Sequence, residues 1–347
     1  MSARRLVRVL AINFLTLAGL FAVVEASLRV REHVRGAPKL DQQYGREDQP
    51  GYFVPDEVFG YRGPSRGGRY RVVSVLGRDT TYDVTYSLLP GGWRMVPQPS
   101  PRSSDRFVAF FGCSFTFGEG VPDTATLPAV FAAGTRYPAH VYDRGFHGWG
   151  PQAMLALLEA PDYRLGIPQR SGVAVFTTID DHLARLLGDY HVVSDWGPRM
   201  PYYERGHDGI PTRHGDFTTG RPFLRVVYGI ARHSRVLSRL LGGATRRLHS
   251  AEDWSFMADV FQRSCTLFAE RYDSHGCYVV IWPTMVEEHL QLAPRLRERG
   301  VRVLDYSSLW QYADSVRYQI RNDGHPTPAA YRVVGARLTA DLDDAGW

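Results

Sequence analysis

The chain has 347 residues, 44% of them apolar and 22% charged, with a formal net charge of +5. These proportions are typical of a folded globular protein and exclude an intrinsically disordered chain. The positive charge comes from scattered arginines without a run of interleaved aromatic residues, so we expect no nucleic-acid partner. The cysteines, Cys113, Cys265 and Cys277, form no C-x-x-C pair, so we expect no zinc or other metal site, and we predict no cofactor. A disulfide between Cys265 and Cys277 is one alternative, which requires an oxidising compartment.

The N-terminus is basic and then apolar. Three arginines in the first eight residues precede residues 9–24, which carry no charge. Sixteen helical residues rise about 24 Å, and extension to Leu28 closes most of the gap to a hydrocarbon core of about 30 Å. We interpret residues 1–30 as a signal anchor or a cleaved signal peptide, with a buried helix as the other alternative. An anchor predicts a single-pass protein of the cytoplasmic membrane whose remaining chain is periplasmic.

The rest of the chain divides into two parts. Residues 31–104 begin with a polar stretch, 31–60, which we interpret as a linker, and two segments rich in Val, Tyr and Thr then predict a small β element at 69–76 and 80–88. In residues 105–347, short apolar runs alternate with amphipathic ones, which predicts an α/β domain with a central parallel sheet. The predicted strands are 107–111, 140–142, 173–178, 277–282 and 301–304. The predicted helices are 124–133, 151–160, 222–241, 251–273, 286–299 and 329–342.

One long segment interrupts this alternation. Residues 190–220 are rich in Gly, Pro, His and aromatic side chains. Long insertions in α/β proteins are usually functional or mobile, so we interpret this one as a wall or lid over a site.

The first apolar run of the main domain ends at a candidate nucleophile. Phe107 to Phe111 are followed by Gly112, and Ser114 lies two residues beyond that glycine. A serine on the turn that leaves a buried strand is raised above the sheet edge, near free backbone N–H groups, as a nucleophile and its oxyanion donors require. The alternative is an ordinary turn in which Ser114 bonds its own backbone. Cys113 is a rival nucleophile, but in an extended segment its side chain points away from that of Ser114.

A candidate base lies near the C-terminus. Asp323-Gly324-His325 precedes Thr327 and Pro328, which suit the N-cap and first position of the last helix. A carboxylate two residues before a histidine can turn back to a ring nitrogen, fixing the tautomer and stabilising the charged ring. The alternative is a simple turn with a surface histidine.

Three segments together resemble the SGNH (GDSL-like) hydrolase superfamily: G-C-S-F-T-F-G-E-G at 112–120, D-R-G-F-H-G-W-G-P-Q at 143–152 and N-D-G-H-P at 322–326. The N-terminal segment also looks like that of membrane-anchored bacterial members. The resemblance implies a three-layer α/β/α flavodoxin-like SGNH fold. It also implies Ser114 as nucleophile and oxyanion donor, Gly148 as a second donor, His325 as base and Asp323 as its orienting acid.

The chain departs from this pattern after the strand 173–178. Asp180 stands where the family usually has an oxyanion-donating asparagine, and an ionised carboxylate cannot donate. The cluster Asp180, Asp181, His182 and Arg185 has three interpretations: the start of a helix with Asp180 or Asp181 as N-cap, a group that positions substrate, or a metal-binding group, although no octahedral or tetrahedral ligand set is evident.

These observations predict a serine esterase that forms an acyl-enzyme on an ester of the cell envelope, such as an acetylated glycan or a lipid. Two alternatives remain: an O-acyltransferase acting on envelope polysaccharide, and a non-catalytic scaffold or glycan-binding protein with the same fold.

Overall fold

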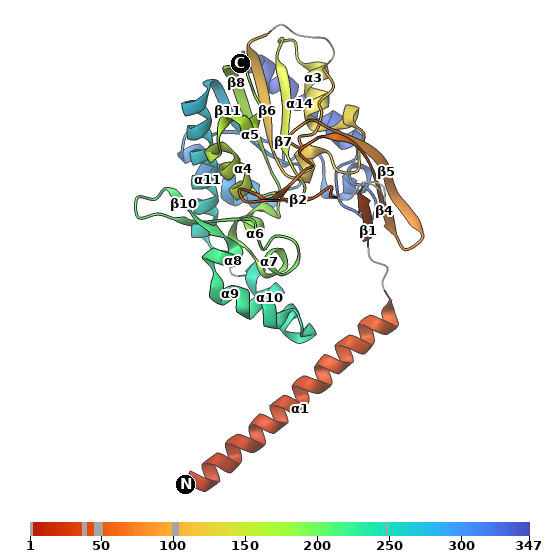
Figure 1. The fold of residues 1–347 in the computed structure, drawn as a ribbon, viewed down its shortest axis with the longest axis vertical. Helices are drawn as coiled ribbons and strands as arrows, with labels where there is room; N and C mark the ends of the chain where they lie inside the picture. The colour runs from red at the N-terminus through yellow and green to blue at the C-terminus, as the bar shows by residue number, and fades with distance from the viewer. Residues whose placement is uncertain (1–2, 37–39, 45–50, 99–103, 248) are drawn as a thin grey trace.

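A five-stranded parallel sheet forms the centre of the molecule (Figure 1). The computed structural model describes residues 3–36, 40–44, 51–98, 104–247 and 249–347. The strands lie in the order β12-β11-β8-β6-β7, and all neighbouring pairs are parallel. Counted along the chain within this sheet, the order is 2-1-3-4-5, which is the flavodoxin-like order. The predicted α/β fold with a central parallel sheet is confirmed. Its strands are β6 (Arg106–Gly112), β7 (His140–Gly145), β8 (Ser171–Thr178), β11 (Asp273–Ile281) and β12 (Arg302–Asp305).

Helices cover both faces of this sheet, because successive side chains of its strands point to opposite sides. In β6, Val108 and Phe110 belong to one core while Phe107 and Phe111 belong to the other, and all four are fully buried. The first core is closed by α3 (Leu127–Gly134) and α14 (Pro328–Ala345). The second core is closed by α4 (Pro151–Glu159) and α11 (Ala251–Arg271). The domain therefore has three layers.

An antiparallel sheet precedes the main domain. Its strands are β1 (Leu40–Tyr44), β4 (Gly68–Leu76) and β5 (Asp79–Leu88), in the order β1-β4-β5, and a small hairpin joins β2 (Val54–Asp56) to β3 (Gly60–Arg62). The interpretation of residues 31–60 as a linker is wrong for residues 51–60, because Tyr52 and Phe59 are buried in the core of the main domain. Residues 37–39 and 45–50 of that stretch lie outside the described residues.

Three predicted helices begin or break differently from the sequence pattern. The segment 124–133 is a 3-10 turn (Asp123–Ala125) followed by α3, because the Thr126 side chain accepts from the Ala129 N–H and caps a new helix. The segment 286–299 is a π-helical turn (Glu288–Leu292) followed by α12 (Ala293–Glu298), at whose start Pro294 has no N–H to donate.

The third of these is the segment 222–241, which forms two helices, α9 (Pro222–Ala231) and α10 (Arg235–Arg247). Ser234 lies between them and accepts from the Leu237 N–H, which starts the second helix.

The segment 190–220, expected to be a wall or lid, contains α7 (Tyr190–Asp195), the hairpin β9 (Pro201–Arg205) and β10 (Pro211–Asp216), and α8 (Phe217–Gly220). Met200 and Phe217 are buried in the main core, so this segment is packed onto the domain. The remaining short helices are α2 (Ser114–Phe117), α5 (Asp162–Leu165), α6 (His182–Leu187) and α13 (Ser315–Tyr318), with a 3-10 turn at Tyr312–Asp314.

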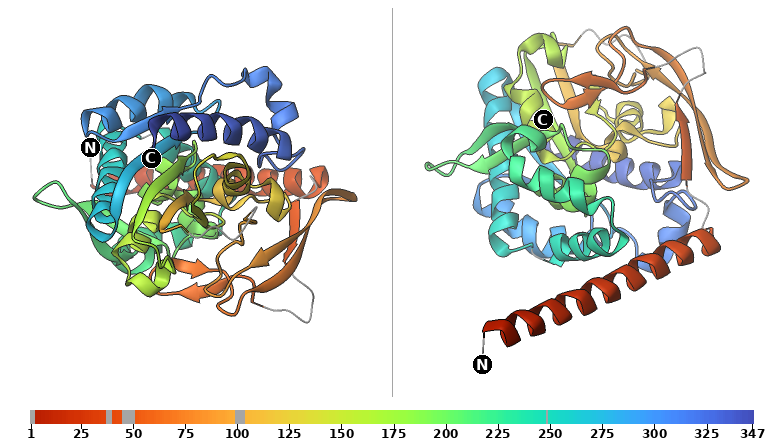
Figure 2. Two further views of the ribbon diagram at one scale, coloured as in Figure 1. Left: turned by 90° about the horizontal axis from the view of Figure 1, so that it is seen from above. Right: turned by 60° about the horizontal axis from the view of Figure 1, so that its bottom comes forward.

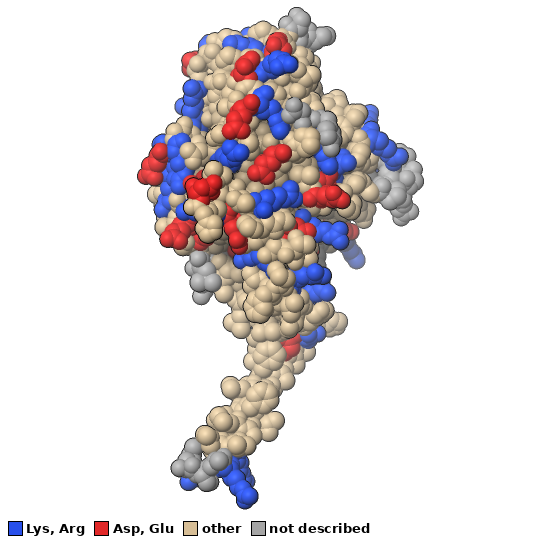
Figure 3. Space-filling view, turned by 60° about the vertical axis from the view of Figure 1, so that its left-hand side comes forward, with Lys and Arg blue, Asp and Glu red and all other residues tan. Residues whose placement is uncertain are grey.

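The N-terminal helix α1 (Ala3–Arg35) lies outside the globular body, as the right-hand view of Figure 2 shows. Its segment Arg4–Val34 is long and apolar enough to cross a membrane, and a signal sequence would pass the same test. Figure 3 shows basic side chains at its N-terminal end and an uncharged surface along the rest of its apolar half.

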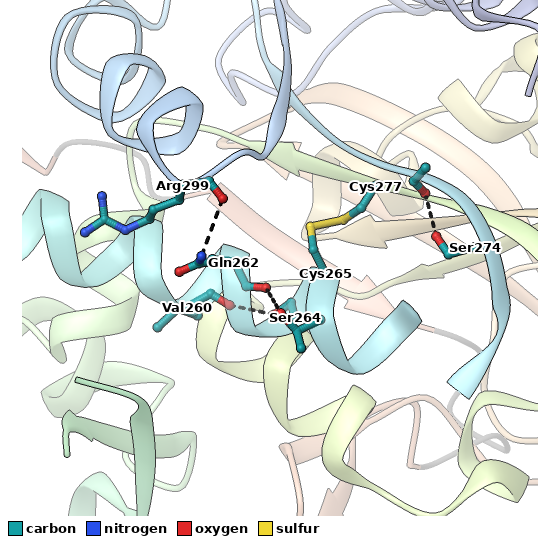
Figure 4. The surroundings of a disulfide bond; sticks show 9 residues. Val260, Gln262, Ser264, Cys265, Ser274, Cys277 and Arg299 are labelled. Carbon is teal, nitrogen blue, oxygen red and sulfur yellow. Dashed lines mark hydrogen bonds between the residues drawn. A yellow bond between two sulfur atoms is a disulfide. The ribbon is translucent and has the colours of Figure 1, made fainter. Parts of the chain in front are cut away.

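A disulfide joins Cys265 on α11 to Cys277 on β11 (Figure 4). It links one covering helix to the strand beneath it across a sequence separation of 12 residues. The alternative that the sequence left open is therefore formed.

We expect the double variant Cys265→Ser/Cys277→Ser to unfold more easily. A loop of this length predicts a loss of about 3 kcal/mol in unfolding free energy, since the unfolded chain is no longer constrained. Urea unfolding of the purified protein under oxidising conditions measures this difference. Adding reductant should destabilise the native chain and leave the double variant unchanged; equal unfolding midpoints for both proteins would contradict the expectation.

Candidate active site

Ser114 lies where the chain leaves β6, at the carboxyl edge of the sheet. The direction in which strands are added reverses between β6 and β8, and the crevice at such a point is where open α/β sheets bind ligands. Gly112 permits the sharp turn into α2, because a Cβ there would come within 1.9 Å of Thr116 Oγ1. The structure therefore places a hydroxyl where this topology provides a site.

The three residues expected to form a triad come together. His325 Nε2 lies 2.8 Å from Ser114 Oγ, although 211 positions separate the two residues in the chain. His325 Nδ1 lies 2.5 Å from Asp323 Oδ1, which also accepts from the backbone N–H of His325 at 3.1 Å. The intervening Gly324 has φ +91°, so the chain turns tightly enough for the carboxylate to reach back to the ring.

The loop that carries His325 is fixed at both ends. The N–H of Ile320 donates to the carbonyl of His325 at 2.7 Å, and Gln319 and Pro326 form an isolated antiparallel bridge. Just beyond, the Thr327 side chain accepts from the Ala330 N–H and caps α14, as the sequence predicts. The loop that carries the imidazole is thus fixed by backbone hydrogen bonds to residues 319 and 320 before it and by the capped start of α14 after it.

A second carboxylate, which sequence reasoning missed, faces the same imidazole. Glu119 is 4% exposed, and its Oε2 lies 3.5 Å from His325 Nε2, the nitrogen that faces Ser114. The same oxygen lies 2.5 Å from His147 Nδ1. On the far side of that ring, His147 Nε2 lies 2.8 Å from the hydroxyl of Tyr52.

Three side chains from the N-terminal sheet complete the surroundings of Glu119. Its Oε1 accepts from Gln42 Nε2 at 2.9 Å and from the hydroxyls of Tyr44 and Tyr82 at 3.2 Å each. These donors come from β1 and β5. The N-terminal sheet is therefore part of the wall of the site. In the sequence, Glu119 of the first motif is the one sign of this contribution. The residues that donate to Glu119 lie too far away in the chain to be recognised from spacing.

The electrostatic effect on His325 follows from this arrangement. Burial alone would lower the pKa of His325, but the carboxylates of Glu119 and Asp323 overcome it and raise that pKa above its usual value. Burial would likewise raise the pKa of Glu119, yet the imidazoles of His325 and His147 and its hydrogen bonds hold it well below the usual range. Glu119 is thus a buried anion whose field favours the protonated form of His325.

A buried arginine holds the loop between Ser114 and Glu119. The side chain of Arg94 donates to the carbonyls of Phe117, Gly118 and Val121 at 2.8–3.0 Å. Its Nε donates to Asp123 Oδ1 at 3.0 Å, and the guanidinium lies over the ring of Tyr86. Arg94 follows β5, so this contact too connects the N-terminal part of the chain to the loop that follows Ser114. The sequence did not single it out.

Gly148, the second expected oxyanion donor, lies in a tightly packed loop. Its φ is +69°, and a Cβ would come within 2.4 Å of the Tyr61 hydroxyl and 2.7 Å of the Trp196 ring. Trp196 belongs to the segment 190–220, which therefore does form a wall beside this loop. The next residue is held as well, because Arg185 Nη1 donates to the carbonyl of Trp149 at 3.0 Å.

The residues expected after β8 have three different surroundings. Asp180 is exposed, and its N–H donates to Met285 Sδ at 3.2 Å. Asp181 precedes α6 without capping it and instead accepts from Arg185 at 3.3 Å, so the helix-start interpretation is wrong for its side chain. His182 is fully buried, and neither of its ring nitrogens has a hydrogen-bond partner among the described residues. Burial, followed by the charge of Arg185, holds its pKa well below the usual value.

Cys113, the rival nucleophile, and potential metal ligands have surroundings that differ from those of Ser114. Cys113 is fully buried, and burial raises the pKa of its thiol, which disfavours the reactive thiolate. Within the described part of the chain, no group of three His, Cys, Asp or Glu side chains is arranged to hold a metal ion.

No protein-family model matches the chain, and no curated protein matches its sequence. Similar solved structures include a lipolytic protein of the G-D-S-L family from Veillonella parvula, with 12% identity and a TM-score of 0.35, covering 68% of this chain and 97% of that one. An acetyl xylan esterase from the rumen bacterium Butyrivibrio proteoclasticus has 10% identity and a TM-score of 0.40, over 72% and 66% of the two chains. A carbohydrate esterase family 2 enzyme from Corynascus thermopiles has 12% identity and a TM-score of 0.39, over 79% and 73%. Similarity at this level does not assign the chain to a family.

We expect Glu119→Gln to lower the pKa of His325. The amide keeps an oxygen that can accept from Gln42 and the tyrosines but removes the negative charge that faces the ring. NMR titration of the His325 imidazole measures the change. The matched control is Glu159→Gln, which alters a carboxylate on α4 that accepts from the Tyr203 hydroxyl. A His325 pKa that does not move in Glu119→Gln would show that the carboxylate does not act on the ring.

We expect Arg94→Ala to destabilise the fold strongly. The substitution leaves three carbonyls and Asp123 without their buried donor, and breaking such a pair costs about 3–5 kcal/mol. Chemical denaturation measures this loss. Arg71→Ala, which removes a solvent-exposed ion pair with Asp83 on the neighbouring strand, should change the unfolding midpoint little. Equal midpoints for the two variants would contradict a structural role for Arg94.

Proposed function

We propose that the protein is a serine ester hydrolase of the SGNH type that works through an acyl-enzyme. The observation that carries this proposal is the continuous chain of contacts from Ser114 Oγ to His325 Nε2, and from His325 Nδ1 to Asp323 Oδ1. The position of Ser114 just beyond β6, where the order of strand addition reverses, supports the same conclusion.

The proposed reaction has two steps. In the first, Ser114 Oγ attacks the ester carbonyl while His325 Nε2 accepts the hydroxyl proton, which the ring then gives to the leaving alcohol. In the second, water attacks the acyl carbon and gives a proton to His325; the bond between that carbon and Ser114 Oγ then breaks, the imidazolium returns the proton to Oγ, and the acid leaves. Asp323 orients the ring and stabilises the imidazolium formed in each step.

The oxyanion is proposed to be held by backbone N–H groups. Ser114 at the start of α2 and Gly148 in the packed loop are the candidate donors, in keeping with the rigid surroundings of both. Asp180 carries no proton to donate when ionised, so we assign the oxyanion no contact with its side chain. Asp181 and Arg185 are proposed to support the Trp149 loop rather than to touch substrate.

We further propose that α1 anchors the protein in the cytoplasmic membrane, with the remaining chain in the periplasm and substrates among the esters of the cell envelope, such as acetylated glycans or lipids. The apolar length of α1 supports the anchor. The Cys265–Cys277 disulfide supports an oxidising compartment, since such bonds persist outside the cytoplasm.

We expect a fluorophosphonate probe to label the protein on Ser114. Ser114→Ala removes the nucleophile and should reduce labelling by at least about a thousandfold. Labelling is read by in-gel fluorescence, with folding checked by circular dichroism. The control Cys113→Ser should remain labelled, because that side chain lies buried behind the turn. Labelling that persists in folded Ser114→Ala would end the proposal.

We expect the labelling rate of the wild-type protein to rise with pH through a midpoint that is higher than an ordinary histidine would give. His325 must be neutral to accept the serine proton, and its pKa lies above the usual value of 6.5. Rates measured from acid to mildly alkaline pH should therefore rise through a midpoint above 6.5. In Glu119→Gln the midpoint should move to lower pH; a midpoint at or below 6.5 in the wild type is the contrary result.

A further inference from the structure

The helix α9 presents an apolar stripe to solvent. Phe223, Val226 and Ile230 are 77%, 60% and 61% exposed and recur at the spacing that places side chains on one helix face. The opposite face of α9 is already used, because Tyr228 and Ala231 are buried against α7 and α10. The exposed stripe is therefore not the face by which α9 joins the body.

The charge around this stripe has one sign. Residues 217–250 contain seven arginines and no aspartate or glutamate. Among them, Arg225 and Arg232 are exposed on α9 and at its end. Amphipathic helices with an apolar stripe and arginine on the polar face are typical of helices that lie in the interface of a membrane with anionic lipids.

The same helix pair is joined directly to α1. Glu25 of α1 accepts from the backbone N–H groups of Arg235 and Val236 at 3.0 Å each, which satisfies two free donors at the start of α10. Glu32 of α1 pairs with Arg235 at 2.9 Å and with Arg239 at 3.1 Å. These contacts begin at the residue that follows the uncharged segment 9–24. Figure 1 shows α9 and α10 on the side of the body that faces α1.

We propose that α9 and α10 lie on the surface of the membrane that α1 enters, with the stripe of Phe223, Val226 and Ile230 inserted at the boundary of headgroups and acyl chains and the arginines against anionic lipid headgroups. The contacts with α1 indicate that a bilayer, rather than another protein, covers the stripe. Glu25 holds the start of α10 at the end of the apolar segment of α1, so the membrane that α1 enters is the nearest surface. The body would then be held by two contacts, and its orientation over the membrane would be set. This inference rests on the proposed insertion of α1.

The test uses the full chain in vesicles of phosphatidylcholine with about one third phosphatidylglycerol. A polarity-sensitive fluorophore is attached to one introduced thiol at a time, in Val226→Cys or Ile230→Cys. Cys113 is buried and the other two cysteines are bonded to each other, so the introduced thiol is the reactive one. Leu15→Cys in α1 reports insertion of the anchor. Ala133→Cys is the solvent control, since it is exposed on α3, at the end of the body away from α1 in Figure 1.

We expect lipids with spin-labelled acyl chains to quench the probes at 226 and 230 at least about twofold more than the probe at 133, with a blue-shifted emission, and less so without the anionic lipid. Quenching at 15 but not at 226 and 230 would overturn the inference while leaving the anchor intact. A blue shift at 226 without lipid quenching would mean that a protein covers the stripe, which also overturns it. No quenching at 15 would overturn the anchor and, with it, this inference, whereas labelling of Ser114 by the fluorophosphonate would be unaffected.

Discussion

The buried negative charge of Glu119 is the constraint on which the arrangement of the site depends. A carboxylate taken out of water is stable only when cations or hydrogen-bond donors surround it. Here the surrounding groups come from three places: the donors Gln42, Tyr44 and Tyr82 from the N-terminal sheet, the imidazole of His147 from the loop after β7, and the imidazole of His325, an ion-pair contact, from the loop before α14. Satisfying one charge therefore requires the N-terminal sheet, the second motif and the C-terminal loop to meet.

The same requirement explains why the N-terminal strands pack onto the domain that carries Ser114. Arg94, next to β5, is buried and donates to three carbonyls of the loop that follows Ser114, so the N-terminal part of the chain supplies a cation to that loop as well as the donors that surround Glu119. Within this loop Phe117 and Thr116 are fully buried, but the three carbonyls depend on Arg94 as a side-chain donor. Its geometry is fixed by groups delivered from residues 42–94, a region with no catalytic signal in its sequence.

Local patterns account for what the sequence could predict. The strand Phe107–Phe111, the turn at Gly112 and the cap of the last helix are set within a few residues, and they locate Ser114, Asp323 and His325. Glu119 and Arg94 could not be found in this way, because their role is defined only by atoms far away in the chain. The break between α9 and α10 has a local signal in Ser234, which accepts from the Leu237 N–H, but its second partner, Glu25 of α1, is far away in the chain. The segment 31–60 was interpreted as a linker because most of its residues are polar, and composition alone does not show that aromatic residues such as Tyr52 and Phe59 are buried.

The two carboxylates around His325 also determine the conditions that suit the site. An interaction accelerates a reaction only if it is stronger in the transition state than in the resting enzyme. Above the pKa of His325 the resting ring is neutral, so in the proposed reaction attraction by Glu119 and Asp323 would act only when the ring takes the serine proton. Below that pKa the ring is already charged, so the attraction would be present before the proposed reaction starts and the ring could not accept the serine proton. Because Glu119 raises the pKa of His325, the proposed proton transfer is efficient only at a higher pH than an ordinary histidine would require, while the same charge stabilises the imidazolium that the transfer would create.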